Sequence, residues 1–278
     1  MMNLGEVNTL RVLRFTSVGA YLGDAEDNDV LFPNKYLTED LDIDSEVDVY
    51  LYRDSEDRLV ATTERPLIDL YGFAYLQTKA VNYFGAFMDW GLEKDLMVPF
   101  KEQKLKFEEG RYYLVTLQLD EATDRLFASA KVNRFLQECT EDFDPKKEVN
   151  LLICEQTELG VKVIVENKYS GLIFNNDISR PVTPGQRTTG FVAKVRQDGK
   201  LDVRLDPTSY AKVSGSAEKI LEILKTKKFI ALTDKSHPDD IREALGMSKK
   251  TFKQAIGNLY RERIIRLEKD GIYLNEKN

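Results

Sequence analysis

The sequence has few of the side chains on which enzymes and metal centres depend. Its 278 residues include one histidine, His237, and two cysteines, Cys139 and Cys154. Ser-His-Asp and Cys-His catalysis need an imidazole, and thiolate zinc sites need more cysteines at short spacing. The nucleotide-binding glycine motifs and the Gly-x-Ser-x-Gly motif are also missing. We therefore expect a protein that is not an enzyme and needs no cofactor or metal. The abundant aspartates leave a carboxylate-metal nuclease as the enzyme alternative.

Long apolar runs are missing as well. No run approaches the roughly 18 to 20 residues that a membrane helix needs, and the first residues do not show a basic segment followed by an apolar one. The composition, with 42% hydrophobic and 31% charged residues, is that of a globular protein, and the length allows several domains. We expect a cytoplasmic protein without membrane contact.

An internal repeat organises the first two hundred residues. Each of three segments has a glycine between apolar residues near its start and a polar turn followed by a strand near its end. The turn follows the glycine by 38, 39 and 39 residues in the pairs Gly19 and Asp57, Gly85 and Asp124, and Gly160 and Gly199. Agreement of this kind indicates three copies of one structural unit.

The repeated units are predicted to be small β-barrels. Polar and apolar residues alternate in segments such as 46–52 and 112–119, which is typical of antiparallel strands with one buried face. A sheet of five short strands removes its exposed edges by closing on itself. The repeat glycine suits a bend in a strand that coils around such a barrel. We expect a mainly β, multidomain protein with barrels at 1–66, 67–145 and 146–213.

The units resemble the S1 RNA-binding domain, an OB-fold barrel whose typical sequence has two aromatic residues around Gly-Ala. Phe84-Gly85-Ala86-Phe87 matches that pattern in full, and the resemblance covers residues 4–66, 71–136 and 148–207. The first and third units keep the pattern less completely. At the histidine position of the family the three units have Phe32, Val98 and Phe174.

The last segment, 214–278, has helical rather than strand periodicity. One helix is expected around the apolar stripe Ala217, Ile220, Leu221 and Leu224, and a second around Ile241, Ala244 and Leu245. Ser236 is expected to cap the second helix, Gly246 to end it, and Ser248 to cap a third. A hairpin is expected over 264–274. Three helices and a hairpin, together with the sequence of residues 244–253, resemble a winged helix-turn-helix domain.

Taken together, three S1-like units followed by a winged helix resemble the bacterial conserved virulence factor B family, the YitL-like proteins. This resemblance implies an RNA-binding, non-enzymatic regulator of gene expression in the cytoplasm.

The net charge of −7 is unevenly distributed and indicates where nucleic acid could bind. The four units carry net charges of −9, −5, +3 and +4 in chain order. Phosphate contacts favour the third barrel and the winged helix, and base stacking favours the aromatic residues of the second barrel. We expect single-stranded RNA to bind there. The candidate residues are Tyr83, Phe84, Phe87, Arg125, Lys162, Lys168, Phe174, Lys200, Arg204, Lys249, Lys250 and Lys253.

Several alternatives remain open at this stage. Phe84 and Phe87 could fill the core of the second barrel instead of binding bases. The winged helix could bind DNA as a transcription regulator, or the chain could be a protein adaptor on ribosomes or RNA-processing enzymes. In the first barrel, alternating carboxylates at Asp40, Asp42, Asp44, Glu46 and Asp48 would lie together in an extended segment. They would form a solvated face or a docking site for a basic protein.

Overall fold

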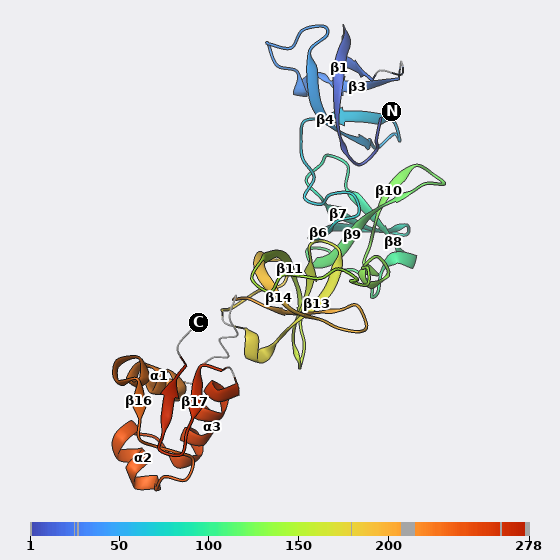
Figure 1. The fold of residues 1–278 in the computed structure, drawn as a ribbon. Coiled ribbons are helices and arrows are strands. Elements are labelled where there is room, and N and C mark those ends of the chain that lie inside the picture. The colour runs from blue at the N-terminus through green and yellow to red at the C-terminus, as the bar shows by residue number, and fades with distance from the viewer. Residues whose placement is uncertain are drawn as a thin grey trace.

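The computed structural model describes residues 2–24, 26, 28–178, 180–206, 215–261 and 263–275. Three β-sheet units follow one another along the chain, and a helical module stands at the C-terminal end (Figure 1). The predicted fold class is confirmed. The predicted boundary between residues 213 and 214 lies outside the described residues.

The three β units contain the same five strands in the same order, each with a 3-10 turn after the third strand. Barrel 1 contains β1 (Val7–Thr16), β2 (Gly19–Gly23), β3 (Asp29–Pro33), the turn η1 (Asn34–Tyr36), β4 (Glu46–Arg53) and β5 (Leu59–Thr62). Barrel 2 contains β6 (Phe73–Val81), β7 (Gly85–Asp89), β8 (Leu96–Pro99), η2 (Phe100–Glu102), β9 (Tyr112–Asp120) and β10 (Arg125–Ser129), and is followed by η3 (Val132–Arg134). Barrel 3 contains β11 (Glu148–Gln156), β12 (Gly160–Val165), β13 (Tyr169–Phe174), η4 (Asn175–Asp177), β14 (Arg187–Val195) and β15 (Leu201–Arg204).

The units differ in how completely they close. In barrels 1 and 3 the third strand pairs in parallel with the fifth, which joins Leu31 to Val60 and 171–173 to 201–203. In barrel 2 the strand order is β10-β9-β6-β7-β8, so β8 and β10 are the two edges of a curled sheet. This arrangement is the partly open form of a five-stranded OB barrel.

The repeat glycines occupy the same place in all three units. Gly19, Gly85 and Gly160 each begin the second strand opposite the end of the third. A Cβ atom at these positions would lie 2.0 to 2.3 Å from a carbonyl oxygen of the third strand. Glycine is therefore required by close approach of two backbones, rather than only by the bend that the sequence suggested.

Two seams join the three barrels through shared apolar cores. Tyr50 and Tyr52 of barrel 1 pack edge-on against Trp90 of barrel 2, inside one continuous buried cluster. Between barrels 2 and 3 a second cluster includes Phe73 and Leu152. The hydroxyl of Tyr75 donates to the carbonyl of Cys154 across this seam, and Arg187 donates to the carbonyl of Phe73 at 2.8 Å. Neighbouring barrels are thus packed together over apolar surface.

The C-terminal module, residues 215–275, combines three helices with a small sheet around its own core. Its elements are α1 (Gly215–Lys227), β16 (Phe229–Ile230), α2 (Pro238–Leu245), α3 (Lys249–Arg261), β17 (Ile265–Leu267) and β18 (Ile272–Leu274). The expected hairpin is present, and β16 adds a third strand beside β18 that the sequence pattern did not predict.

Local details of α2 correct two expectations. His237, not Ser236, is the N-cap residue, and its ring accepts a hydrogen bond from the Asp239 N–H. Ser236 instead accepts from the Thr233 N–H at 2.8 Å, within a turn. Ala244 is exposed rather than part of the apolar stripe. Gly246 ends the helix with a φ of 63°, as predicted.

The expected row of carboxylates in barrel 1 is not extended. Turns interrupt it at 39–40 and 43–44, and Asp44 has a φ of 69°. Only Glu46 and Asp48 lie on a strand, β4, where Asp48 accepts a 2.6 Å hydrogen bond from Thr9. Because the turns reverse the chain direction, the carboxylates do not share one strand face.

Candidate nucleic-acid interface

OB-fold barrels bind oligonucleotides on the face of strands 2 and 3 and on the loops after strands 1 and 4. In barrel 2 the first of these loops, residues 82–84, carries Tyr83 and Phe84 at its tip. Their side chains are 82% and 56% exposed, and their ring centroids lie 4.1 Å apart. Asn82 holds the loop by accepting a 2.9 Å hydrogen bond from the Phe84 N–H. The sequence therefore places an aromatic pair in solvent at this tip.

Phe87 lies on the outer side of β7, because Ala86 and Met88 on either side of it are fully buried. It lines a pocket of 570 Å³ at the seam with barrel 1, and Arg125 lines the same pocket. Arg125 forms an ion pair with Asp57 of barrel 1 at 2.5 Å. The structure thus brings Phe87 together with Arg125, and Tyr83 together with Phe84. Neither Phe84 nor Phe87 fills the barrel interior.

In barrel 3 the corresponding face forms a groove of 880 Å³. Lys162 on β12 and Lys200, in the loop before β15, line it together with the apolar side chains of Leu159 and Leu172. Each lysine is neutralised by a neighbour. Lys162 pairs with Glu155 at 2.5 Å, and Lys200 pairs with Asp198 at 3.0 Å.

The other two candidate cations of barrel 3, Lys168 and Arg204, do not line this groove. The β12–β13 turn holds Lys168 at the end of the hairpin opposite Gly160, where it pairs with Glu141 at 3.1 Å. Hydrogen bonds from Tyr169 and Lys168 lower the pKa of Glu141. Arg204 on β15 is half-buried, and its Nε has no hydrogen-bond partner. The structure thus places two of the four predicted cations, Lys162 and Lys200, on one groove, and the binding role of all four stays a prediction.

Phe174 is partly exposed at the end of β13, and the guanidinium of Arg196 lies 5.5 Å from its ring centroid. Arg196 also lines the 880 Å³ groove and pairs with Asp202 at 2.5 Å. Sequence reasoning missed Arg196. No local signal marks it, since it stands 22 residues from Phe174 and meets it only in the folded barrel.

Helix α3 carries Lys249, Lys250, Lys253 and Arg261, and no acidic residue. Ser248 caps it by accepting a 3.1 Å hydrogen bond from the Thr251 N–H. Lys250 and Lys253 are exposed and form no ion pair with any described residue. Lys249 is half-buried, and its Nζ lies 3.5 Å from the carbonyl oxygen of Lys235. A positive helix N-terminus with free lysines beside it is suited to bind phosphate.

The described part of the chain contains no group of three or more histidine, cysteine, aspartate or glutamate side chains that could hold a metal ion. None of its helices is long and apolar enough to cross a membrane.

Comparison with protein families identifies both kinds of module. Residues 4–64 match the S1 domain model, and residues 218–274 match the CvfB-like winged helix domain. A crystal structure of a multidomain protein with nucleic acid binding domains from Streptococcus pneumoniae covers 98% of this chain and 98% of its own, with 23% identity and a TM-score of 0.42.

Relatives match nearly the whole chain. YitL of Bacillus subtilis (strain 168) is 31% identical over 270 residues, which covers 93% of this chain and 89% of YitL. Conserved virulence factor B of Staphylococcus aureus (strain USA300) is 25% identical over 249 residues, which covers 86% of this chain and 82% of the relative. With its repeated OB-fold barrels, its winged helix and this similarity along its length, the chain belongs to the conserved virulence factor B and YitL family.

Proposed function

We propose that the protein is a non-catalytic RNA-binding regulator that holds single-stranded RNA with its barrels and its winged helix. The observation that carries this proposal is the cationic surface of α3, where Lys250 and Lys253 are exposed, pair with no carboxylate in the described part of the chain and share the helix Lys249–Arg261 with no acidic residue. Unpaired cations release the counterions of bound phosphates most effectively, because no internal partner has to be given up. The matches to the S1 domain and to the CvfB-like winged helix domain support nucleic-acid binding.

The aromatic tip of barrel 2 supports a single strand as the ligand. Tyr83 and Phe84 are exposed to solvent, and bases can stack on such rings only when the bases are unpaired. Each stacked base contributes roughly 1 to 3 kcal/mol. We propose that α3 supplies the phosphate anchor and that Tyr83 and Phe84 supply stacking.

Barrel 3 has a lesser electrostatic role in this proposal. Lys162 and Lys200 line its groove, but each is already paired with a carboxylate. A bound phosphate would compete with Glu155 and Asp198 for them. The groove therefore guides the strand, and its contribution to the salt dependence of binding is small. The binding units follow the boundaries 1–66, 67–145, 146–213 and 214–278.

A second candidate, duplex DNA, is favoured by the helix pair itself. Helix α2 ends at Gly246, α3 begins at Lys249, and a helix held in this way can enter a major groove. Only the choice of nucleic acid separates this candidate from the first.

Competition binding distinguishes the two. Full-length protein is titrated against a fluorescein-labelled single-stranded RNA of sixteen nucleotides, and unlabelled RNA or duplex DNA of the same sequence is then added. We expect the RNA to compete at concentrations at least tenfold lower than the duplex. Equal or stronger competition by the duplex would overturn the proposal in favour of DNA. A second experiment separates a binder from a nuclease. Labelled RNA is incubated with the protein and magnesium or manganese, and a binder leaves the length of the RNA unchanged.

A further inference from the structure

The seam between barrels 1 and 2 contains a pocket that neither barrel could form alone. Barrel 1 contributes Tyr52 and the β4–β5 turn at Ser55, and barrel 2 contributes Phe87, Trp90 and Lys94. Tyr52 and Trp90 are almost fully buried and form a T-shaped pair, while Phe87 is partly exposed. At 570 Å³ the pocket falls in the range of about 300 to 1,000 Å³ that is typical of small-molecule sites.

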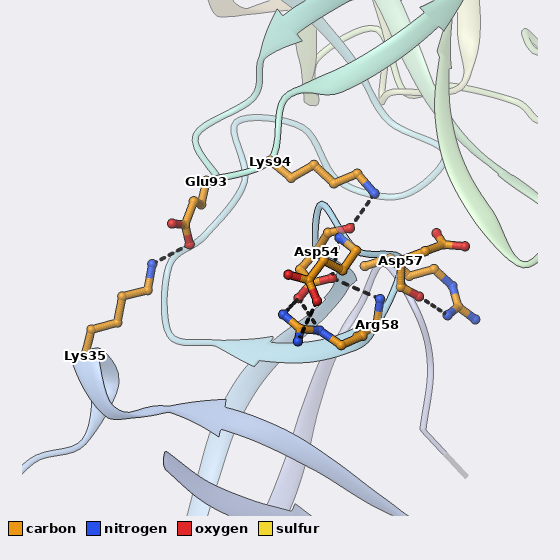
Figure 2. A network of polar contacts seen from close by, with 8 residues as sticks. Lys35, Asp54, Asp57, Arg58, Glu93 and Lys94 are labelled. Atoms are coloured by element: carbon orange, nitrogen blue, oxygen red, sulfur yellow. Dashed lines mark hydrogen bonds and ion pairs between the residues drawn. The ribbon is translucent and has the colours of Figure 1, made fainter. Parts of the chain in front are cut away.

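The carboxylates around the pocket are already matched with cations. Asp57 pairs with Arg125, Glu93 pairs with Lys35 at 2.7 Å, and Asp95 pairs with Lys79 at 3.0 Å. Figure 2 shows the pair of Glu93 with Lys35, and it shows Asp57 and Lys94 in the same view. Of the cations, Arg53 is also matched, because it pairs with Asp124.

Lys94 is the exception among these charges. Its Nζ donates a 2.7 Å hydrogen bond to the backbone carbonyl of Asp54, and the carboxylate of Asp54 is held by Arg58 at 2.6 Å (Figure 2). Lys94 forms no ion pair with any described carboxylate, and burial lowers its pKa. The β7–β8 loop that carries Lys94 is held in place because Trp90 Nε1 donates a hydrogen bond to the Lys94 carbonyl. A half-buried lysine thus faces a pocket with aromatic walls, and the two described carboxylates that act on its charge, Asp57 and Asp54, are each paired with an arginine.

We propose that this pocket binds one nucleoside phosphate, with the base against Phe87 and the phosphate at Lys94. A planar ring and an anion on one small molecule match two features of the pocket, a partly exposed aromatic wall and a lysine that forms no ion pair with a described carboxylate. If the ligand is a nucleotide of a bound RNA strand, the proposal rests on the function proposed above. In this proposal barrel 1, the most acidic unit, forms one wall of the site and does not bind nucleic acid by itself.

Trp90 provides a direct reporter, since it is the single tryptophan of the chain and lines the pocket. Full-length protein is titrated with adenosine monophosphate and, separately, with an octamer of adenylate RNA, and tryptophan fluorescence is recorded. We expect a saturable change with both probes. Tighter binding of the octamer, by tenfold or more, identifies a strand as the source of the nucleotide, and equal affinity identifies the free nucleotide.

Two pairs of variants test the walls of the pocket. Lys94→Gln keeps a donor for the Asp54 carbonyl but removes the charge, and is expected to weaken binding of either probe at least fivefold. Lys106→Gln makes the same change on an exposed lysine of barrel 2 outside the pocket and is expected to have no effect. Ser55→Phe fills the pocket from the side of barrel 1 and is expected to weaken binding tenfold, whereas Glu56→Phe in the same turn leaves it unchanged.

The results separate failure of this site from failure of the proposed function. If labelled RNA binds the protein but Trp90 fluorescence does not respond and Lys94→Gln binds like the wild type, the pocket is not a nucleotide site and RNA binding stands. If the adenosine monophosphate signal is present but labelled RNA does not bind, the pocket stands as a nucleotide site and the proposed function falls. Equal binding by Ser55→Phe and the wild type would overturn the role of barrel 1.

Discussion

Burial determines the chemistry of the two thiols. Cys154 is packed in the seam between barrels 2 and 3, and burial raises its pKa to about 12; Cys139 is also buried. The reactive form of cysteine is the thiolate, and a raised pKa keeps the thiol of Cys154 neutral at pH 8. We predict that Ellman's reagent does not react with Cys154 at pH 8 until the protein is unfolded in guanidinium chloride. Rapid reaction of both thiols in the native protein would contradict this packing.

Unpaired lysines should dominate the salt dependence of RNA binding. Reversing the charge of both Lys250 and Lys253 removes two cations from α3. We expect the double variant to bind RNA about tenfold more weakly or worse, and the plot of log affinity against log salt concentration to become flatter. The matched control reverses Lys225 and Lys227, which are equally exposed on α1 of the same module. An equal loss in the two double variants, measured by fluorescence polarisation at several salt concentrations, would show that net charge rather than the α3 surface matters.

At the scale of the strand, the repeat glycine is the most constrained position. A methyl group at Gly85 would lie 2.3 Å from the Val98 carbonyl oxygen, which is a backbone atom of the paired strand. We predict that Gly85→Ala destabilises barrel 2 by about 2 to 3 kcal/mol, because β7 and β8 would have to separate. The urea midpoint of Trp90 fluorescence measures this change.

The control for this prediction is a glycine with free space around it. Gly257 lies within α3, and a Cβ atom there would meet nothing within 4 Å. Gly257→Ala is expected to leave the Trp90 transition unchanged and to stabilise the helix by about 0.5 to 1 kcal/mol, seen by circular dichroism. A Gly85→Ala midpoint equal to that of the wild type would mean that the two strands do not approach as closely as described.

Sequence patterns predicted elements well where a residue has to satisfy a local geometric requirement. Gly246 is predicted to end its helix and adopts the left-handed conformation, and Ser248 is predicted to cap the next helix and accepts a hydrogen bond from the Thr251 N–H. Strand β16 escaped prediction because two residues show no periodicity. The pairing of Lys162 with Glu155 also escaped it, since that contact depends on which residues of β11 and β12 face each other.

At the scale of the whole molecule, the seams make the barrels one packed body rather than a flexible string. Apolar clusters run across both seams, and ion pairs add to the first of them. The described hydrogen bonds and ion pairs of residues 215–275, in contrast, stay within that module. The structure therefore pairs a body of packed barrels with a separately packed winged helix. The sequence patterns predict these modules, but not the apolar clusters that join the barrels.

Acid should weaken the first seam. The hydrogen bond from Arg125 lowers the pKa of Asp57 in the folded protein below its ordinary value of 3.8. The pair therefore stabilises the folded state fully above pH 3.8, and this stabilisation is lost as the pH falls through the lower pKa of the folded state. We predict that Asp57→Asn lowers the urea midpoint of Trp90 fluorescence at pH 7 and that the difference from wild type shrinks below pH 4. Asp42→Asn, an exposed carboxylate of the same barrel, is the control. A difference that stays constant between pH 7 and pH 3 would contradict the assignment.

The most direct test of RNA binding is to crosslink the full-length protein to RNA in living cells with ultraviolet light and to map the linked peptides. The account predicts RNA attached to peptides that contain Tyr83 and Phe84 and to peptides of α3. Recovery of no RNA above the level of unirradiated cells would contradict it.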